Sequence, residues 1–256
     1  MITANEVLAF LETIAPTALK MDWDNVGLLC GRGDKPVRTV MVALDPFTSV
    51  CEEAASAGAD LLVTHHPLIF HPLTSVTDSS TVGRAIRVLI ANDITAVNAH
   101  TNLDCAEGGV NDTLAQCLNL ERIKKINEDP AGLLRQGIVA EQPLEAFLSS
   151  VKAALGCKAL RYVSGDRPVK RVAVGGGACG SEMAAVIAAG CDTFITADVK
   201  YNQFCDAAEL GLNLIDAGHF QTENPVCRVL ADKIQTAFPE LTVLQSKSHK
   251  DPMKFY

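Results

Sequence analysis

Two short motifs in this sequence place a histidine and a carboxylate at the same spacing. His100 precedes Asp104 by four positions, and His219 precedes Glu223 by four positions. Imidazole nitrogen and carboxylate oxygen both bind divalent transition metals, and sites that use them without thiolates are usually catalytic rather than structural. The two motifs therefore indicate a catalytic metal centre.

A pair of adjacent histidines, His65 and His66, adds two more imidazoles after the apolar run 61–64. Pro67 supports a strand that ends here, because proline cannot donate to a sheet ladder. Neighbouring side chains on a strand point to opposite faces, so one ring could be buried while the other meets solvent. At a strand end the backbone can also turn both rings into one site. The residues alone leave both interpretations open.

Each of the other motif residues has an ordinary structural interpretation. Asp104 could cap a helix expected at 110–118, and Glu223 could interact with the dipole of a helix that starts near Pro225. His219 could lie in a surface loop. The metal interpretation is favoured because the His-x-x-x-carboxylate motif recurs at equivalent points of an internal duplication.

The duplication relates residues 38–66 to residues 170–198 at a constant offset of 132. Each copy reads as a strand, a helix that ends at a glycine, and a second strand that ends at a threonine. A further helix and strand follow in both copies, and each then reaches its histidine motif. This alternation predicts an α/β fold of two pseudo-repeated lobes with mixed, largely parallel sheets.

In such sheets, ligands collect beyond the carboxyl ends of the strands. The histidine motifs lie at those ends, so two copies facing each other would gather the candidate ligands between the lobes: His65, His66, Asp104, His219 and Glu223. The copies are not equivalent. Where the first has its histidine pair, the second has Ala197 and Asp198, so it contributes Asp198 or nothing.

The repeat also suggests domain boundaries. We expect a first lobe over residues 1–125, a connecting segment over 126–168 and a second lobe over 169–256. The first lobe begins with an amphipathic helix, because Thr3 and Glu6 have the spacing of a capping box.

The overall composition restricts the functional class. With 256 residues, of which 48% are hydrophobic, the chain can bury a large core. A net charge of −8 argues against a non-specific nucleic-acid binder. Nine cysteines are scattered through apolar segments without a Cys-x-x-Cys pair, which favours small buried hydrophobes in a reducing, cytoplasmic environment. No apolar run approaches the roughly 18 residues of a membrane span.

Other motifs carry weaker signals. The glycines at 175–177 follow a strand as a phosphate-binding turn would, but the full glycine pattern is missing, so a tight turn is expected. Cys105, beside Asp104, is expected to act as a small hydrophobe rather than as a ligand. His71 and His249 have no partner in the pattern and are expected to be loop residues.

Several motifs together resemble one family, the dinuclear-metal-centre proteins named for the NGG-one-interacting factor three. Bacterial members of this family are often labelled GTP cyclohydrolase I type 2 homologues. The resemblance extends over nearly the whole chain. It rests on Asp24–Leu28, Thr64–Leu68, Asn98–Asp104, Gly108–Asp112, the 167–174 stretch and Gly218-His219 with Glu223.

The resemblance implies a short form of the family, without an inserted domain. It implies two divalent metal ions between two α/β lobes, and a ring-shaped homohexamer, a trimer of dimers, with its metal sites on an internal cavity. By family motif the metal ligands are His65, His66, Asp104, His219 and Glu223. His100 is implied as a catalytic-site residue, either as a further ligand or as a proton shuttle.

Three functions are compatible with such a centre. Two ions about 3.5–4 Å apart lower the pKa of bound water, which suits a metal-dependent hydrolase acting on a small, nucleotide-like substrate. The family label suggests opening of the guanine ring of GTP. The alternatives are a non-enzymatic interaction scaffold and a protein that stores or delivers metal. Nitrogen and oxygen ligands admit zinc, iron, manganese, cobalt or nickel.

Overall fold

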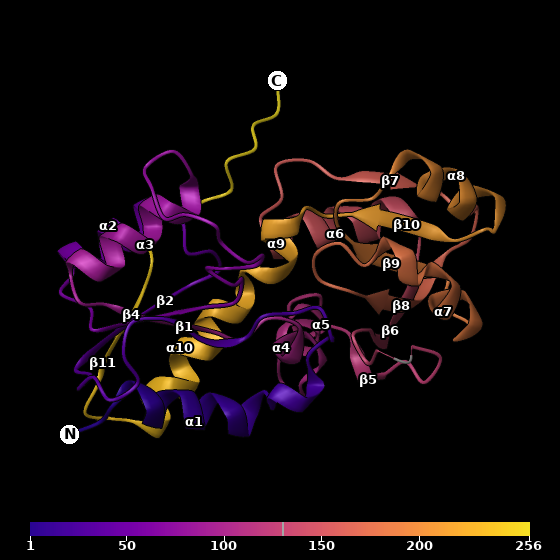
Figure 1. Ribbon diagram of the computed structural model, residues 1–256. Coiled ribbons are helices and arrows are strands. Elements are labelled where there is room, and N and C mark those ends of the chain that lie inside the picture. The colour runs from indigo at the N-terminus through magenta and orange to yellow at the C-terminus, as the bar shows by residue number, and fades with distance from the viewer. Residues whose placement is uncertain (130) are drawn as a thin grey trace. The chain divides into compact units, whose positions relative to one another are not determined.

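The computed structural model describes residues 1–129 and 131–256, which divide into two compact units (Figure 1). Unit 1 comprises residues 1–107 and 226–250, and unit 2 comprises residues 108–225 and 251–256. Each unit contains one mixed β-sheet. Among the described residues, no helix has both the length and the apolar character needed to cross a membrane.

Unit 1 is built on a five-stranded sheet in which only the first strand is antiparallel to its neighbour. The central strands are buried along their whole length, as expected for a parallel sheet covered on both faces. The strands, in spatial order, are β1 (Gly27–Cys30), β4 (Thr95–Asn98), β3 (Leu61–Thr64), β2 (Thr39–Ala43) and β11 (Thr242–Gln245).

Helices cover both faces of this sheet. One face packs against α2 (Thr48–Ser56) and α3 (Thr81–Ala91), whose apolar side chains join Leu62 in one buried cluster. Figure 1 shows α1 (Ala4–Ile14) and α10 (Pro225–Ala237) on the opposite side. The remaining elements of unit 1 are the short helices η1 (Thr17–Leu19) and α4 (Thr101–Cys105).

The predicted capping box is confirmed at the start of α1. The Thr3 hydroxyl accepts a hydrogen bond from the Glu6 amide at 3.3 Å, and the Glu6 carboxylate accepts one from the Thr3 amide at 2.8 Å. Two of the amides that a helix start leaves without helical partners are thereby satisfied.

Unit 2 is built on a six-stranded sheet whose three consecutive inner strands β8, β9 and β10 run parallel. Antiparallel strands flank them on both sides. The strands, in spatial order, are β5 (Glu121–Lys125), β6 (Arg135–Gln142), β8 (Val169–Val174), β9 (Thr193–Thr196), β10 (Asn213–Asp216) and β7 (Arg161–Val163).

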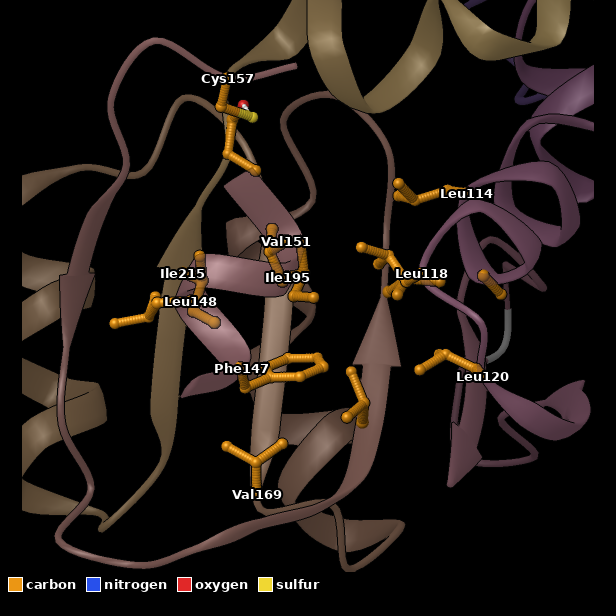
Figure 2. Close-up of a cluster of buried hydrophobic side chains, with 14 of the residues drawn as sticks. Leu114, Leu118, Leu120, Phe147, Leu148, Val151, Cys157, Val169, Ile195 and Ile215 are labelled. Carbon is orange, nitrogen blue, oxygen red and sulfur yellow. Dashed lines mark hydrogen bonds between the residues drawn. The ribbon is translucent and has the colours of Figure 1, made fainter. Parts of the chain in front are cut away.

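The two faces of this sheet bury separate cores. On one face α6 (Leu144–Leu155) places Phe147, Leu148 and Val151 against strand residues such as Ile195 (Figure 2). The other face packs against α7 (Met183–Ala188) and α8 (Tyr201–Glu209). Burying a side chain the size of Phe147 stabilises the fold by about 1.5–3 kcal/mol. The other helices of unit 2 are α5 (Val110–Cys117), η2 (Gly180–Glu182) and α9 (His219–Glu223).

The internal duplication is visible in the topology. The strands β2, β3 and β4 run parallel with β3 in the middle, and β8, β9 and β10 do the same with β9 in the middle. A single-turn helix that carries the histidine motif follows the third strand in each unit, α4 after β4 and α9 after β10. The expected α/β fold with two largely parallel mixed sheets is confirmed.

The elements outside the duplication do not follow the boundaries expected from the sequence. Residues 135–163, expected in a connecting segment, supply β6, α6 and β7 to unit 2. Residues 226–245, expected in the second lobe, supply α10 and β11 to unit 1. The reason is a long-range pairing, because β11 adds in parallel to β2 with Val243 opposite Val40.

Candidate metal centre

Three histidine rings meet in unit 1. The ring centroids of His65, His66 and His100 are 4.9, 5.2 and 5.4 Å apart in pairs, and ring nitrogens of all three lie within 4.8 Å of one another. His65 and His66 follow the end of β3, where the Thr64 hydroxyl donates to the His66 carbonyl at 2.7 Å. Both rings of the pair therefore face one place, as the strand-end interpretation requires.

Asp104 joins this cluster from α4. Its Oδ1 lies 3.6 Å from Nε2 of His65, and its side chain is almost completely buried. Two ligand atoms on one ion, each at about 2.0–2.2 Å, lie roughly 3–3.6 Å apart. The capping interpretation of Asp104 is wrong, because α5 begins after Gly109 and has no side-chain cap.

Unit 2 carries the second histidine motif on α9. His219 and Glu223 lie one helical turn apart on the same face, with 3.0 Å between Nε2 and Oε2. The Glu223 side chain is only 5% exposed, although it is a carboxylate. His219 is the first residue of a helix and not a surface-loop residue, because Gly218 ends the preceding turn at φ 86°.

Four histidines, two from the His-x-x-x-carboxylate motifs and two from the adjacent pair, each have a hydrogen-bond acceptor at Nδ1. An acceptor there places the ring proton on Nδ1 and leaves the Nε2 lone pair available to a metal ion. The acceptors are Ala99 O for His65 (2.9 Å), Asp45 Oδ1 for His66 (2.7 Å), Asp24 Oδ1 for His100 (2.8 Å) and Asp198 Oδ2 for His219 (2.7 Å). The donor set and its orientation fit a divalent metal.

Asp24 is one of the residues whose role the sequence did not reveal. Its side chain is fully buried, and besides His100 it accepts from the backbone amide of Thr101 at 3.0 Å. Burial alone would raise the pKa of Asp24, but the hydrogen bonds from His100 and Thr101 outweigh it and lower that pKa. The Asp24 carboxylate is therefore anionic at neutral pH and holds the Nδ1 proton of His100.

Asp45 has a similar role for His66, and it has a second partner. Its Oδ2 lies 2.9 Å from Nε2 of His249, whose ring also lies against Phe47 with centroids 5.6 Å apart. His249 is a loop residue, as expected, but it has a partner that the sequence pattern did not show. Burial tends to raise the pKa of Asp45, and the hydrogen bonds from His249 and His66 outweigh burial and lower it.

The C-terminal loop that carries His249 is fixed to α2. The Glu53 carboxylate accepts from the backbone amides of Lys247 at 2.8 Å and Ser248 at 3.1 Å, and from the Ser246 hydroxyl at 2.5 Å. The final turn of the chain in unit 1 is thus part of the support of His66.

The glycine turn at 175–177 is a tight turn, as expected, and not a phosphate cradle. The amide of Gly176 donates to Asn111 Oδ1 at 2.7 Å, and that of Gly177 donates to Thr222 Oγ1 at 3.1 Å. Its importance lies elsewhere: a Cβ on Gly177 would lie 2.1 Å from Oε1 of Glu223. The turn allows the backbone to approach the carboxylate closely.

Six of the nine cysteines are buried as small hydrophobes, whereas Cys205 is exposed. Cys105 is buried within α4, and burial raises the pKa of the Cys51 and Cys191 thiols to about 12 and that of Cys157 to about 11. Thiols with such pKa values are protonated at neutral pH and are poor metal ligands.

Comparison with known proteins gives one consistent family. Residues 2–252 match the family model described as Duf34/NIF3 (NGG1p interacting factor 3). A Clostridium perfringens protein named GTP cyclohydrolase 1 type 2 homolog is 36% identical over 259 residues, which cover 98% of each chain. A Streptomyces coelicolor protein of the same name is 38% identical and covers 97% of this chain and 92% of its own.

The structural comparison agrees. The crystal structure of a Bacillus cereus protein related to NIF3 matches with a TM-score of 0.93 and 25% sequence identity, over 100% of this chain and 99% of that one. The family expected from the sequence motifs is confirmed.

Proposed function

Since this chain belongs to the Duf34/NIF3 family, we propose that it is a dinuclear metal-binding hydrolase that acts on a small, nucleotide-like substrate. The observation that carries the proposal is a hydrogen-bonding pattern that four imidazoles share. Each has its Nδ1 against a carboxylate or carbonyl oxygen, which places the ring proton on Nδ1 and suits the Nε2 lone pair to metal binding or proton transfer.

The proposed ligands are those of the two histidine motifs and the histidine pair. They would hold two divalent ions, drawn from zinc, iron, manganese, cobalt or nickel, and five protein ligands leave coordination positions open for water. Two bound ions would lower the pKa of such a water towards neutrality and polarise a substrate bond. The five residues are His65, His66 and Asp104 from unit 1, and His219 and Glu223 from unit 2.

We propose His100 as the catalytic residue that holds or moves a proton at Nε2. Asp24 fixes the ring through Nδ1 and, being anionic, stabilises the ring when Nε2 takes up a proton. Ring contacts with both His65 and His66 place His100 beside the proposed ligands.

The names of the relatives support the proposed substrate class. Proteins named GTP cyclohydrolase 1 type 2 homolog suggest hydrolysis of a ring bond in a guanine nucleotide. The ring-shaped homohexamer, a trimer of dimers, stays a prediction from the family resemblance, and light scattering of the purified protein tests it.

The test of the centre is metal content per chain in protein purified without added metal. We expect two ions in the wild type and a clear loss in His65→Ala and in Glu223→Ala, with unchanged circular dichroism. His71→Ala is the matched control, because His71 is an exposed histidine of unit 1 outside the cluster. A wild-type protein that holds no metal after reconstitution would overturn the proposal.

The same variants test whether the two ligand sets serve one centre. If the two ligand sets serve one centre, His65→Ala in unit 1 and Glu223→Ala in unit 2 should each lower the metal content per chain by more than one ion. If each variant loses only a single ion and keeps the other at full occupancy, the two sets are independent. If metal-loaded protein hydrolyses neither GTP nor simpler guanine compounds, the proposed hydrolase activity is overturned and the proposed metal binding stands.

A further inference from the structure

Two large aromatic side chains stand exposed beside the histidine cluster of unit 1. Trp23 is 62% exposed and Phe70 is 41% exposed. Their ring centroids are 5.8 Å apart, and each lies 6.2 Å from the ring of His100. Large apolar side chains gathered at the surface mark binding sites more often than isolated ones do.

The turn that carries Trp23 is rigidly attached to the site. Asp24, the next residue, binds the His100 ring and the Thr101 amide. Asn25, the residue after that, donates through Nδ2 to the carbonyl of Ile69 at 2.6 Å, directly before Phe70. Two consecutive side chains thus fix the backbone on which both aromatic rings stand. A ligand that uses these rings meets a prearranged surface and orders little of it on binding.

We propose that Trp23 and Phe70 form a stacking subsite for a planar heteroaromatic ring, presented to His100. The two rings meet edge to face, with 67° between their planes, and the His71 ring also lies 4.7 Å from Phe70. Because Trp23 is 62% exposed, its ring still offers surface for a further ring to stack on. Ligand sites typically combine apolar and aromatic walls with a few polar groups, which here are the histidine nitrogens. The inference rests on the proposed function in one respect, the placing of the reaction at this cluster.

With this subsite, the protein would recognise its substrate mainly through the substrate's heteroaromatic ring. The glycine turn in unit 2 offers no phosphate cradle, because its amides are engaged with Asn111 and Thr222. Stacking tolerates different bases, since every base has a π face. The class is therefore planar nucleobases and related heterocycles, with or without a sugar phosphate, and guanine is the member that the names of the relatives suggest.

Trp23 is the only tryptophan in the chain, so its fluorescence reports directly on the subsite. We would titrate metal-loaded protein with guanosine and, for comparison, with ribose. Guanosine is expected to change the Trp23 emission saturably, and ribose to leave it unchanged. Phe70→Leu should weaken guanosine binding about tenfold. Tyr201→Leu is the matched control, because Tyr201 is an aromatic residue of unit 2 that is 84% exposed.

The outcomes separate this inference from the proposed function. If guanosine causes no saturable change in the Trp23 emission of metal-loaded protein, or if Phe70→Leu binds guanosine as tightly as the wild type, the subsite is overturned. The proposed metal centre is unaffected by either result. If the protein binds guanosine but never holds metal, the proposed metal centre is overturned and the subsite stands. If Trp23 is shielded from acrylamide and becomes accessible only on dilution, a second copy covers the rings, and the subsite is overturned.

Discussion

Equivalent positions in the two units have opposite roles. His66 and Asp198 are 132 positions apart and both follow the middle strand of a parallel trio. In unit 1 this position supplies an imidazole, which Asp45 orients. In unit 2 it supplies a carboxylate, which orients the imidazole of His219. A duplicated strand end can thus carry either an imidazole or the carboxylate that orients one.

A second pair of equivalent positions shows the same divergence. Asp45 and Gly177 are also 132 positions apart. Asp45 extends a carboxylate to His66, whereas Gly177 has no side chain and leaves room for Glu223. At this pair of positions, unit 1 therefore uses a side chain to support an imidazole, and unit 2 uses bare backbone to make room for a buried carboxylate.

The largest effect is expected when the unit 2 residue is copied into unit 1. His66→Asp should weaken metal binding by more than about 100-fold, because loss of an orienting partner alone costs about 10–100-fold. Competition with a chromogenic chelator measures it. His71→Asp, the same change at an exposed histidine, is the control, and equal affinities in the two variants would show that His66 is not a ligand.

The next effect separates the two orienting carboxylates. Asp198→Asn should weaken metal binding about 10–100-fold, because Asp198 orients His219, one of the proposed ligands. Asp24→Asn should leave metal affinity nearly unchanged, because Asp24 orients His100, the proposed proton-transfer residue. It should instead destabilise the metal-free protein by ~2 kcal/mol, because the buried carboxylate binds Thr101 as well as His100. Asp198 is 56% exposed, so Asp198→Asn should leave metal-free stability unchanged. Equal melting temperatures of the two chelator-treated variants would contradict this distinction.

A smaller effect is expected at the glycine turn. Gly177→Ala brings a Cβ within 2.1 Å of the Glu223 carboxylate, at a backbone φ of +64°. Gly156→Ala is the matched control, because Gly156 has a φ of +65° but open space around its Cβ position. Both variants should lose about 1–2 kcal/mol from the left-handed backbone, and only Gly177→Ala should also lose metal affinity. Identical metal titrations would show that the close approach has no role.

The smallest effect concerns the C-terminal loop, which supports Asp45 but has no counterpart at Gly177. Burial would raise the pKa of Glu53, but hydrogen bonds from Ser246, Ser248 and Lys247 outweigh it and lower the pKa from 4.5 to about 2. A lowered pKa means that this stabilisation is complete above pH 4.5 and is lost as the pH falls towards 2.

Hydrogen exchange of residues 246–250 tests this point. Exchange should accelerate as the pH drops through that window, after correction for the intrinsic rate and relative to the buried strand β3. In Glu53→Gln the loop should exchange rapidly at every pH. A loop that stays protected in Glu53→Gln would contradict the assigned role of the carboxylate.

The sequence predicted the features that depend on local patterns. The capping box of Thr3 and Glu6 is present, and the duplicated strands end where the histidine motifs begin. The repeated His-x-x-x-carboxylate spacing singled out His219 and Glu223 as a pair, and their side chains lie 3.0 Å apart. These predictions succeeded because each depends on residues within one or two turns of each other, or on a comparison of the chain with itself.

The orienting groups could not be predicted in the same way. Asp24 lies 76 positions from His100 in the sequence, and the chain contains 30 acidic residues, none of which carries a local mark of this role. The pairing of β11 with β2 was missed for the same reason, because a short strand without strict alternation does not reveal its partner. Tertiary packing decides both.

The discontinuity of unit 1 has a consequence for biosynthesis. Its sheet acquires β11 only after the ribosome has passed residue 245, whereas unit 2, apart from its last six residues, is complete at residue 225. Domains commonly fold as units during translation, in the order in which they emerge. Unit 1 is therefore begun first but completed after most of unit 2. The edge of β2 stays unpaired until β11 has been synthesised.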